Sequence, residues 1–347
     1  MHLTKTKIII LSVFILLSAS AGYAYSKVHH YYQVFLSHSG LSTTNIKKTL
    51  QQADEISKQL IATSPAQINF LILGLDHRED TLEQTSLTDA IMIGSYHKSS
   101  NTLNLVPLPR DLYLDAQKTK INALYYYEKT TARPGFTLAT LSQVTGQNLE
   151  HFLILDYSLL PELIDLVGGV TIDNPVAFTD DQFPNPQYLV DKTAPIFQTI
   201  SFPAGPQTLT GEKALQFVRS RHSDDQVAGT DLARSQRQMI VIQGLIAQIS
   251  TKRLLLSPDK LGQLYKFWHD KIITNLTDAT LLGLAIYASP ASLPKIQTHA
   301  IPTSLDSQEP LLINPPLSRK YQNQWIFLPT DPSFSKLHHF FETHLTN

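Results

Sequence analysis

The sequence has no cysteine among its 347 residues, and its charges nearly cancel. The lack of cysteine excludes disulfide bonds, a thiolate nucleophile and cysteine-ligated zinc, and it suits an exported protein. Lysine and arginine together number 28 against 29 aspartates and glutamates, which gives a formal net charge of -1. Without a basic excess, no overall field draws the chain to nucleic acid, and we expect no such partner. Any anion site must be local.

Several motifs of familiar enzyme classes are also missing. The sequence contains no His-Glu-x-x-His zinc motif, no glycine-rich phosphate loop and no Gly-x-Ser-x-Gly nucleophile elbow. Its 13 histidines include two isolated pairs, His29-His30 and His338-His339, for which surface or packing roles are the simpler interpretation. Hydrophobic residues make up 42% of the chain, a globular composition. No Gly/Ser-rich linker or internal repeat interrupts residues 66–347, which we interpret as one domain.

The N-terminal segment, residues 1–27, predicts a membrane anchor. Lys5 and Lys7 precede an uncharged, mostly apolar run over residues 8–25, which is nearly long enough to cross a hydrocarbon core of roughly 30 Å. A cleaved export signal is the alternative, because Ala19-Ser20-Ala21 resembles a cleavage site. Either interpretation places the rest of the chain outside the cytoplasm. The anchor would make this a single-pass protein of the cell membrane, with Lys5 and Lys7 on the cytoplasmic side.

Residues 28–65 predict a stalk with one helix, because apolar residues recur at helical spacing after the cap-like residues 42–44. Three apolar runs then predict buried strands over residues 68–74, 90–96 and 102–108. If they form an antiparallel meander, the end of the first, the start of the second and the end of the third share one edge of the sheet. The charged residues at these strand ends are Asp76, Arg78, Asp89, Arg110 and Asp111. A single charged residue at the end of a strand is common, because loops are exposed to solvent. The informative feature is that these five residues are predicted to lie at the same edge of the sheet.

Two further segments bring more arginines. Residues 211–218 and 231–249 predict helices, beginning after Thr210 and at Thr230 or Asp231. Asp231, Arg234 and Gln238 share one face of the second helix, with Arg237 near its margin. Arg219 and Arg221 follow the first helix and share one side of an extended segment. We expect a cluster of six guanidinium groups, from Arg78, Arg110, Arg219, Arg221, Arg234 and Arg237.

Arginine clusters of this kind fit pyrophosphate. A guanidinium group matches two phosphate oxygens at once, which a lysine ammonium does not. Asp76 and Asp89 would supply hard carboxylate oxygens that hold Mg²⁺ against the same phosphates. The residues themselves therefore predict a metal-assisted pyrophosphate site.

The ordered set of motifs resembles the LytR-CpsA-Psr family of envelope proteins. The matching stretches are FLILGLDHR, LTDAIMI, LVPLPRDLYLD, KIN, LIDLVGGVTI, LTGEKALQFVRSR and DLARSQRQ. The resemblance implies an α/β fold, an α-β-α sandwich with a mixed central sheet flanked by helices, a long apolar tunnel for a polyprenyl tail and an arginine-lined mouth. It also implies a membrane-anchored, Mg²⁺-dependent phosphotransferase. Such proteins move a glycopolymer, such as teichoic acid or capsule, from undecaprenyl pyrophosphate to a sugar hydroxyl of peptidoglycan, with pyrophosphatase side activity also possible.

Residue by residue, the resemblance assigns roles within the predicted cluster. Asp76 and Asp89 match the acidic metal-site positions, and Asp231 and Gln238 match the remaining polar members. The matching pyrophosphate ligands are Arg110, Arg219, Arg221 and Arg234. Leu87 departs from the pattern, because the family usually has an arginine at this position; Arg78 is a candidate to replace it.

The sequence is compatible with more than one function. A non-catalytic protein that binds polyprenyl phosphate lipids is the second function class, which the departure at Leu87 keeps in play. A DNA-binding regulator is disfavoured by the absence of a basic stripe. Asp231 and Asp111 are both candidates for the base that takes the acceptor proton, and Asp111 is also a candidate to orient Arg110 through a salt bridge.

Overall fold

The computed structural model describes residues 23, 25–63, 67–76, 87–128, 134–223, 231–249, 251, 254, 256–288 and 294–345. Only the backbone is described for Asp76, Leu189, Asp231, Leu232, Ser235, Ala285 and Ala288. The predicted N-terminal anchor lies almost wholly outside these ranges. Within them, no helix combines the length and the apolar character needed to cross a membrane.

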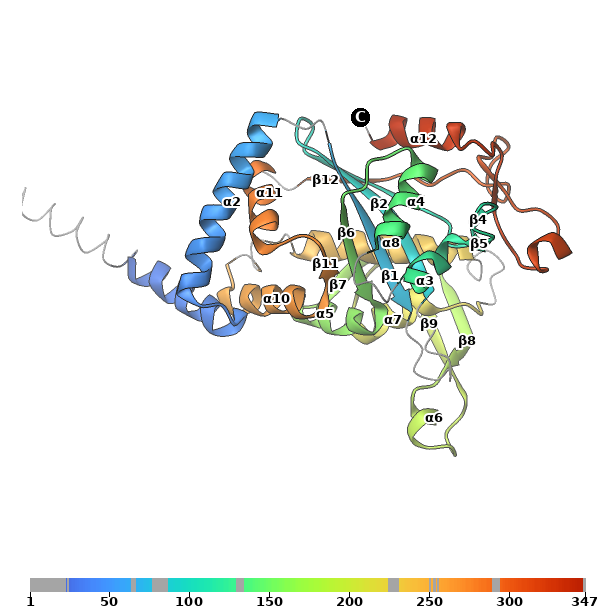
Figure 1. Cartoon of the computed structure of the whole chain (residues 1–347). Coiled ribbons are helices and arrows are strands. Elements are labelled where there is room, and N and C mark those ends of the chain that lie inside the picture. The colour runs from blue at the N-terminus through green and yellow to red at the C-terminus, as the bar shows by residue number, and fades with distance from the viewer. Residues whose placement is uncertain are drawn as a thin grey trace, which may run out of the picture.

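A mixed six-stranded sheet forms the centre of the molecule (Figure 1). Its strands, in spatial order, are β11 (Ile273–Thr274), β6 (His151–Asp156), β1 (Ile68–Asp76), β2 (Leu87–His97), β3 (Thr102–Pro107) and β12 (Lys295–Thr298). β1, β2 and β3 pair antiparallel, which confirms the predicted meander. β6 and β12 pair parallel to β1 and β3 respectively. The predicted sandwich with a mixed sheet is therefore the observed architecture.

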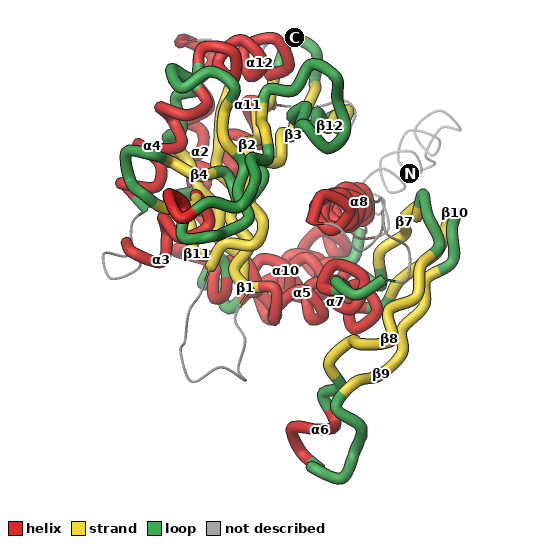
Figure 2. The backbone as a smooth tube through the Cα atoms, turned by 90° about the vertical axis from the view of Figure 1, so that its right-hand side faces the viewer, coloured by secondary structure: helices red, strands yellow, loops and turns green. Residues whose placement is uncertain are grey.

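Alternating side chains of the sheet enter two separate cores. Ala90 and Met92 of β2 belong to one core, and Ile91 and Ile93 to the other, as the two-residue period of a strand requires. The first face is covered by α5 (Leu160–Val167), α7 (Gly211–Arg219), α8 (Asp231–Ile249) and α10 (Pro258–Lys271). The second is covered by α3 (Leu124–Glu128), α4 (Gly135–Thr145) and α12 (Ser335–Leu345). Figure 2 shows the sheet between these two helix layers.

Smaller elements extend from this core. Two antiparallel pairs of strands lie beyond the α5–α8 layer (Figure 2): β7 (Val170–Asn174) with β10 (Gly205–Leu209), and the hairpin of β8 (Phe178–Pro184) with β9 (Phe197–Phe202). α6 (Gln187–Val190) lies at the tip of the β8–β9 hairpin. The remaining pieces are β4 (Tyr113–Leu114), β5 (Thr119–Lys120), η1 (Ile121–Ala123), η3 (Tyr157–Leu159), β13 (Leu312–Ile313), η4 (Arg319–Tyr321) and β14 (Leu328–Pro329).

The helix expected in the stalk is α2 (Thr43–Thr63), and it packs against α11 (Asp278–Ala288) (Figure 1). Ala53 and Ser57 of α2 are buried in this contact region. The two helices approach closely at Gly283, where an added Cβ would lie 2.8 Å from a side-chain carbon of Ile56. Residues 25–39 are also helical. This part of the chain is therefore joined to the folded domain by packing.

Helix α7, which ends at Arg219, is set in place by a close approach to α5. Gly211 donates its N–H to the Oδ1 of Asp165 at 2.7 Å. A Cβ at Gly211 would lie 2.1 Å from the carbonyl oxygen of Pro161. Because the obstacle is backbone, no side-chain rotation relieves the clash.

We therefore expect Gly211→Ala to lower the free energy of unfolding by about 1–3 kcal/mol. Gly135→Ala is the matched control, since among the described residues its added Cβ would meet only the Oε1 of Glu128, at 3.6 Å. Urea denaturation of both variants measures the difference. Equal stability of the two variants would contradict the close approach of α5 and α7.

Candidate active site

The predicted edge of the sheet is organised around Asp89, which lies at a β-bulge. Gly74 of β1 pairs with Ala90, but Leu75 pairs with Thr88, so Asp89 has no residue opposite it. Simple alternation would place its side chain on the face of Ile91. Because a bulge redirects a side chain, Asp89 instead lines a cavity with residues of α8 on the other face. The carboxylate is only 7% exposed.

Two arginines from different parts of the chain hold this carboxylate. Arg110, just beyond the end of β3, donates from Nη1 to Oδ1 of Asp89 at 2.5 Å. Arg221, two residues after α7, donates from Nη2 to Oδ2 at 2.8 Å. Each carboxylate oxygen thus accepts from a different guanidinium group, a charge-assisted arrangement.

The charges around Asp89 outweigh its burial. Burial alone would raise the pKa of Asp89, but the positive charges of Arg110, Arg234 and Arg221, with the hydrogen bond from Arg110, hold that pKa below its ordinary value. The group is therefore an anion at neutral pH. Arg234 is itself buried, at 3% exposure, in α8. Three guanidinium groups on separate elements thus act on one carboxylate.

Asp111 lies near a different nitrogen of the Arg110 guanidinium from the one that contacts Asp89. It is buried and accepts a hydrogen bond from Nζ of Lys120 at 2.7 Å, while its Oδ2 lies 3.4 Å from Nε of Arg110. Asn122 donates its backbone N–H to the carbonyl of Arg110 at 3.2 Å. The KIN stretch, residues 120–122, therefore fixes both the backbone and the ion pair at Arg110. This geometry supports the orienting role of Asp111 over the role of base.

Arg237 has a different role from the one expected of the arginine cluster. It is buried and donates from Nε to the carbonyl of Phe217 at 2.9 Å and from Nη2 to the carbonyl of Ser220 at 2.7 Å. Its guanidinium also lies 4.8 Å from the centre of the Phe178 ring. Burial, together with the charge of Arg234, lowers the pKa of Arg237 to about 10. Arg237 satisfies the carbonyl groups at the end of α7 and is not placed as a phosphate ligand.

Gln238 and Asp89 line the same small cavity between the sheet and α8. The other lining residues are Ala90, Ile91, Met92, Pro107, Leu108 and Met239. The volume of this cavity is about 10 Å³, which is about the room that one water molecule needs. Its lining combines two polar residues with mostly apolar ones, but it is not the long apolar tunnel that the resemblance implied.

The structure thus brings together Asp89, Arg110, Arg221 and Arg234, with Gln238 beside them. Arg219 ends α7 two residues before Arg221. Asp76 ends β1 and pairs through its backbone with Leu87, and Asp231 begins α8, but their side chains lie outside the described part. Arg78 lies wholly outside it. Among the described residues, no group of three or more histidines, aspartates or glutamates is placed to hold a metal ion by itself.

Asp180 of β8 is a further member of this region that the sequence did not reveal. It is completely buried and accepts hydrogen bonds from the segment that carries Arg221. No motif marks the stretch around it, and it lies 40 residues before its partner Ser220.

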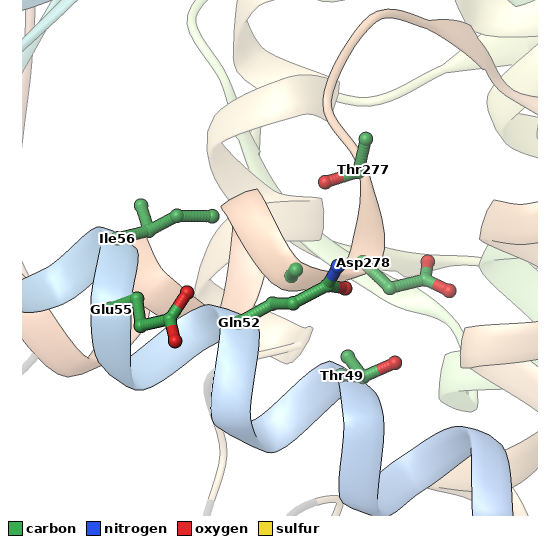
Figure 3. A pocket seen from close by; sticks show the side chains of 7 residues that line it. Thr49, Gln52, Glu55, Ile56, Thr277 and Asp278 are labelled. Carbon is green, nitrogen blue, oxygen red and sulfur yellow. The ribbon is translucent and has the colours of Figure 1, made fainter.

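A second, more open groove lies between α2 and α11 (Figure 3). Its lining comprises Thr49, Gln52, Glu55, Ile56, Thr277, Asp278 and Ala279. Asp278 already accepts a hydrogen bond from the hydroxyl of Tyr265. None of the seven lining residues is basic, so this groove offers no charge complement to a phosphate.

Comparison with known proteins assigns the class. A model of the LytR-CpsA-Psr family (LytR_cpsA_psr) matches residues 33–337. The chain therefore belongs to this family, as its motifs indicated. It is also similar in structure to TagV of B. subtilis, with 22% identity and a TM-score of 0.56 over 80% of this chain and 97% of that one. The similarity shows that the two share a fold.

Two further similarities concern named proteins of the family. An Enterococcus faecalis protein named polyisoprenyl-teichoic acid–peptidoglycan teichoic acid transferase TagU is 23% identical over 210 residues, 59% of this chain and 61% of the relative. The matched part thus spans less than two thirds of that relative. A structure described as TagT bound to LIIa-WTA has 17% identity and a TM-score of 0.53, over 81% of this chain and 92% of that one.

The lowered pKa of Asp89 gives a test of the cluster. In the unfolded chain Asp89 titrates near its ordinary pKa of 3.8, and in the folded state its pKa is lower. Its contribution to stability is therefore complete above about pH 4 and is lost as the pH falls through the folded-state pKa. Asp89→Asn removes this contribution at every pH.

We expect the difference in unfolding free energy between wild type and Asp89→Asn to be constant above about pH 5 and to narrow below about pH 4. Urea denaturation across this range measures it. A difference that widened on acidification would contradict the assignment of Asp89 as an ion-paired carboxylate.

Proposed function

We propose that this protein is a glycopolymer transferase of the bacterial cell envelope. It would transfer a teichoic acid or related polymer from a polyprenyl pyrophosphate carrier, such as the undecaprenyl carrier, to a hydroxyl of peptidoglycan. The observation that carries the proposal is the pairing of Asp89 with Arg110 and Arg221, beside Arg234, at the rim of a cavity with an apolar lining. Membership of the family and the name of the TagU relative support the reaction class.

The cluster is suited to a pyrophosphate because its guanidinium groups come from three separate segments of the chain. Arg110 and Arg221 are only partly buried, with side-chain exposures of 20% and 32%. They therefore reach solvent at the rim, where a second anion is able to contact them. Guanidinium groups bind phosphate oxygens in pairs. An isoprenoid tail along Met92, Leu108 and Met239 would require the cavity that they line, of about 10 Å³, to widen when the ligand binds.

In the proposed reaction, the acceptor hydroxyl oxygen attacks the phosphorus that carries the polymer. A new P–O bond forms, the bridging P–O bond breaks, and polyprenyl monophosphate leaves. The arginines neutralise the negative charge that develops on the bridging and leaving oxygens. The hydroxyl proton passes to a base, for which Asp231 is the candidate because Asp111 is engaged by Lys120. Water in place of the sugar hydroxyl would give the pyrophosphatase side reaction.

Mg²⁺ is the metal that the acidic positions fit. The β1–β2 pairing places the backbone of Asp76 beside Leu87, two residues from Asp89, and Asp89 is ionised. Mg²⁺ is commonly held by one or two carboxylates together with substrate phosphates. Because each oxygen of Asp89 already accepts from an arginine, this carboxylate would be shared between the metal and the guanidinium groups. When bound, Mg²⁺ supplies positive charge to the phosphate oxygens.

The same proposal places the protein at the cell membrane, with residues 8–25 as a single anchor and the catalytic domain outside the cytoplasm. Its carrier would be a membrane lipid and its acceptor the cell wall. A second candidate function is binding of the lipid without turnover. Leu87, which begins β2 and pairs with Asp76, favours it, because an apolar side chain stands where the family usually has an arginine.

Turnover distinguishes the two functions. We expect the full-length protein in detergent to transfer polymer from a polyprenyl pyrophosphate-linked substrate to peptidoglycan fragments. Arg110→Ala should reduce the rate about 10²- to 10³-fold, because it removes one preorganised donor. Arg319→Ala is the matched control, since Arg319 is exposed in η4 and makes no contact with Asp89.

Binding of the lipid without release of polyprenyl phosphate would favour the second function. Equal rates for wild type and Arg110→Ala would contradict the active site.

Removal of the metal tests the proposed role of Asp76 and Asp89 as Mg²⁺ ligands separately from the role of the arginines. We expect treatment with EDTA to abolish turnover and added Mg²⁺ to restore it, because the charge on the phosphates is then neutralised again. Release of polyprenyl phosphate measures both. Full activity in EDTA would overturn the metal role of Asp76 and Asp89 while leaving the transfer reaction intact.

A further inference from the structure

The segment that carries Arg221 is held by one buried carboxylate, that of Asp180. Three donors converge on its Oδ2: the hydroxyl of Ser220 at 2.7 Å, the backbone N–H of Arg221 at 3.1 Å and that of His222 at 3.2 Å. Asp180 and Ser220 are both completely buried. The backbone of residue 180 also forms an isolated antiparallel bridge with Ser223. Asp180 therefore fixes the path of the chain immediately after α7.

A β-bulge in β8 begins directly after Asp180. The pairing of β8 with β9 runs regularly to Asp180 opposite Ile200 and resumes at Phe183 opposite Gln198. Two residues of β8 thus oppose one of β9, which bends the strand. Gln182, within the bulge, donates its N–H to Oδ1 of Asp180 at 3.0 Å. Both oxygens of this carboxylate are consequently occupied by donors.

A second residue, Arg237, restrains the same segment. Arg237 of α8 donates to the carbonyls of Phe217 and Ser220. Asp180 accepts hydrogen bonds from N–H groups of the segment, and Arg237 donates hydrogen bonds to its carbonyl groups. The backbone of residues 217–222 is therefore restrained by two elements. The restrained segment ends in a side chain, Arg221, that reaches Oδ2 of Asp89.

An ionised carboxylate at residue 180 is required by this pattern of donors. The two oxygens accept four hydrogen bonds and donate none. An asparagine presents one oxygen and one NH₂ group. Either orientation of its amide would place an NH₂ group against at least one of these N–H or O–H donors. The four hydrogen bonds also keep the pKa of Asp180 below its ordinary value despite its burial, so the group stays ionised.

We propose that Asp180 is a positioning residue for pyrophosphate recognition, acting through Arg221 without contacting the ligand. The proposal rests on the function proposed above, since it deepens the role of the same site. Asp180 prearranges Arg221 beside Asp89 before the ligand arrives, and this lowers the ordering cost of binding. A buried carboxylate with a purely structural role would stabilise the fold without any specific link to Arg221.

A double-mutant cycle distinguishes these two roles. The full-length protein in detergent is titrated with geranylgeranyl pyrophosphate, a soluble polyprenyl pyrophosphate, in four forms: wild type, Asp180→Asn, Arg221→Ala and the double variant. We expect Asp180→Asn to raise the Kd about tenfold in the wild-type background, through lost hydrogen bonds to a charged group. In the Arg221→Ala background the same change should raise it less than about twofold, because the residue it positions is gone.

Asp181→Asn is the matched control, since Asp181 is the exposed neighbour in the same strand. It should leave the Kd unchanged. If Asp180→Asn does not fold, Ser220→Ala removes one of the three donors to Oδ2 and should raise the Kd about threefold, again only when Arg221 is present.

The outcomes separate the positioning role from the proposed function. The positioning role alone would be overturned if Asp180→Asn raised the Kd by the same factor with and without Arg221. An unchanged Kd in a folded Asp180→Asn protein would overturn it as well. Failure of the wild type to bind the probe would overturn the proposed function and the positioning role with it.

Discussion

The site depends on the pairing of one desolvated carboxylate, Asp89, with guanidinium groups from separate parts of the chain. A buried charge is costly unless a partner compensates it, and arginines placed together repel one another. The pairing reduces both costs, because Asp89 accepts hydrogen bonds from Arg110 and Arg221 and its negative charge also interacts with Arg234, which lowers the pKa of Asp89. Removal of the carboxylate would leave the arginines without this compensation. Removal of one arginine would leave the negative charge of Asp89 with less compensating positive charge.

The fold delivers these groups through two irregularities in its strands. The bulge at Asp89 redirects a side chain that alternation would have turned towards the other core, and the bulge after Asp180 lies beside the segment that carries Arg221. Around them, regular packing fixes the rest: the KIN stretch supports Arg110, and Gly211 allows α7 to approach α5. The regular elements thus supply rigidity, while the bulges supply the geometry of the site.

Much of this arrangement was predictable from the sequence. Runs of Ile, Leu and Val marked the three strands of the meander, and antiparallel pairing then required Asp89 and Arg110 to share an edge. The bulge was not predictable, because it depends on how β1 and β2 align in the folded sheet. Asp180 lacks a motif and meets its partners only through tertiary contacts. Arg237 was expected to be a phosphate ligand, but its Nε and Nη2 donate to the carbonyls of Phe217 and Ser220. The spacing of apolar residues predicted the helix α2 in the expected stalk. Its packing against Gly283 was not predictable, because Gly283 belongs to α11, far away in the sequence.

A crystal structure of the protein with a soluble polyprenyl pyrophosphate bound would test the proposed site most directly. We expect the pyrophosphate to contact Arg110, Arg221 and Arg234, with the isoprenoid tail passing Met92 and Met239 between the sheet and α8. A pyrophosphate bound elsewhere on the surface, with Asp89 and its arginines unchanged and without ligand contact, would contradict it.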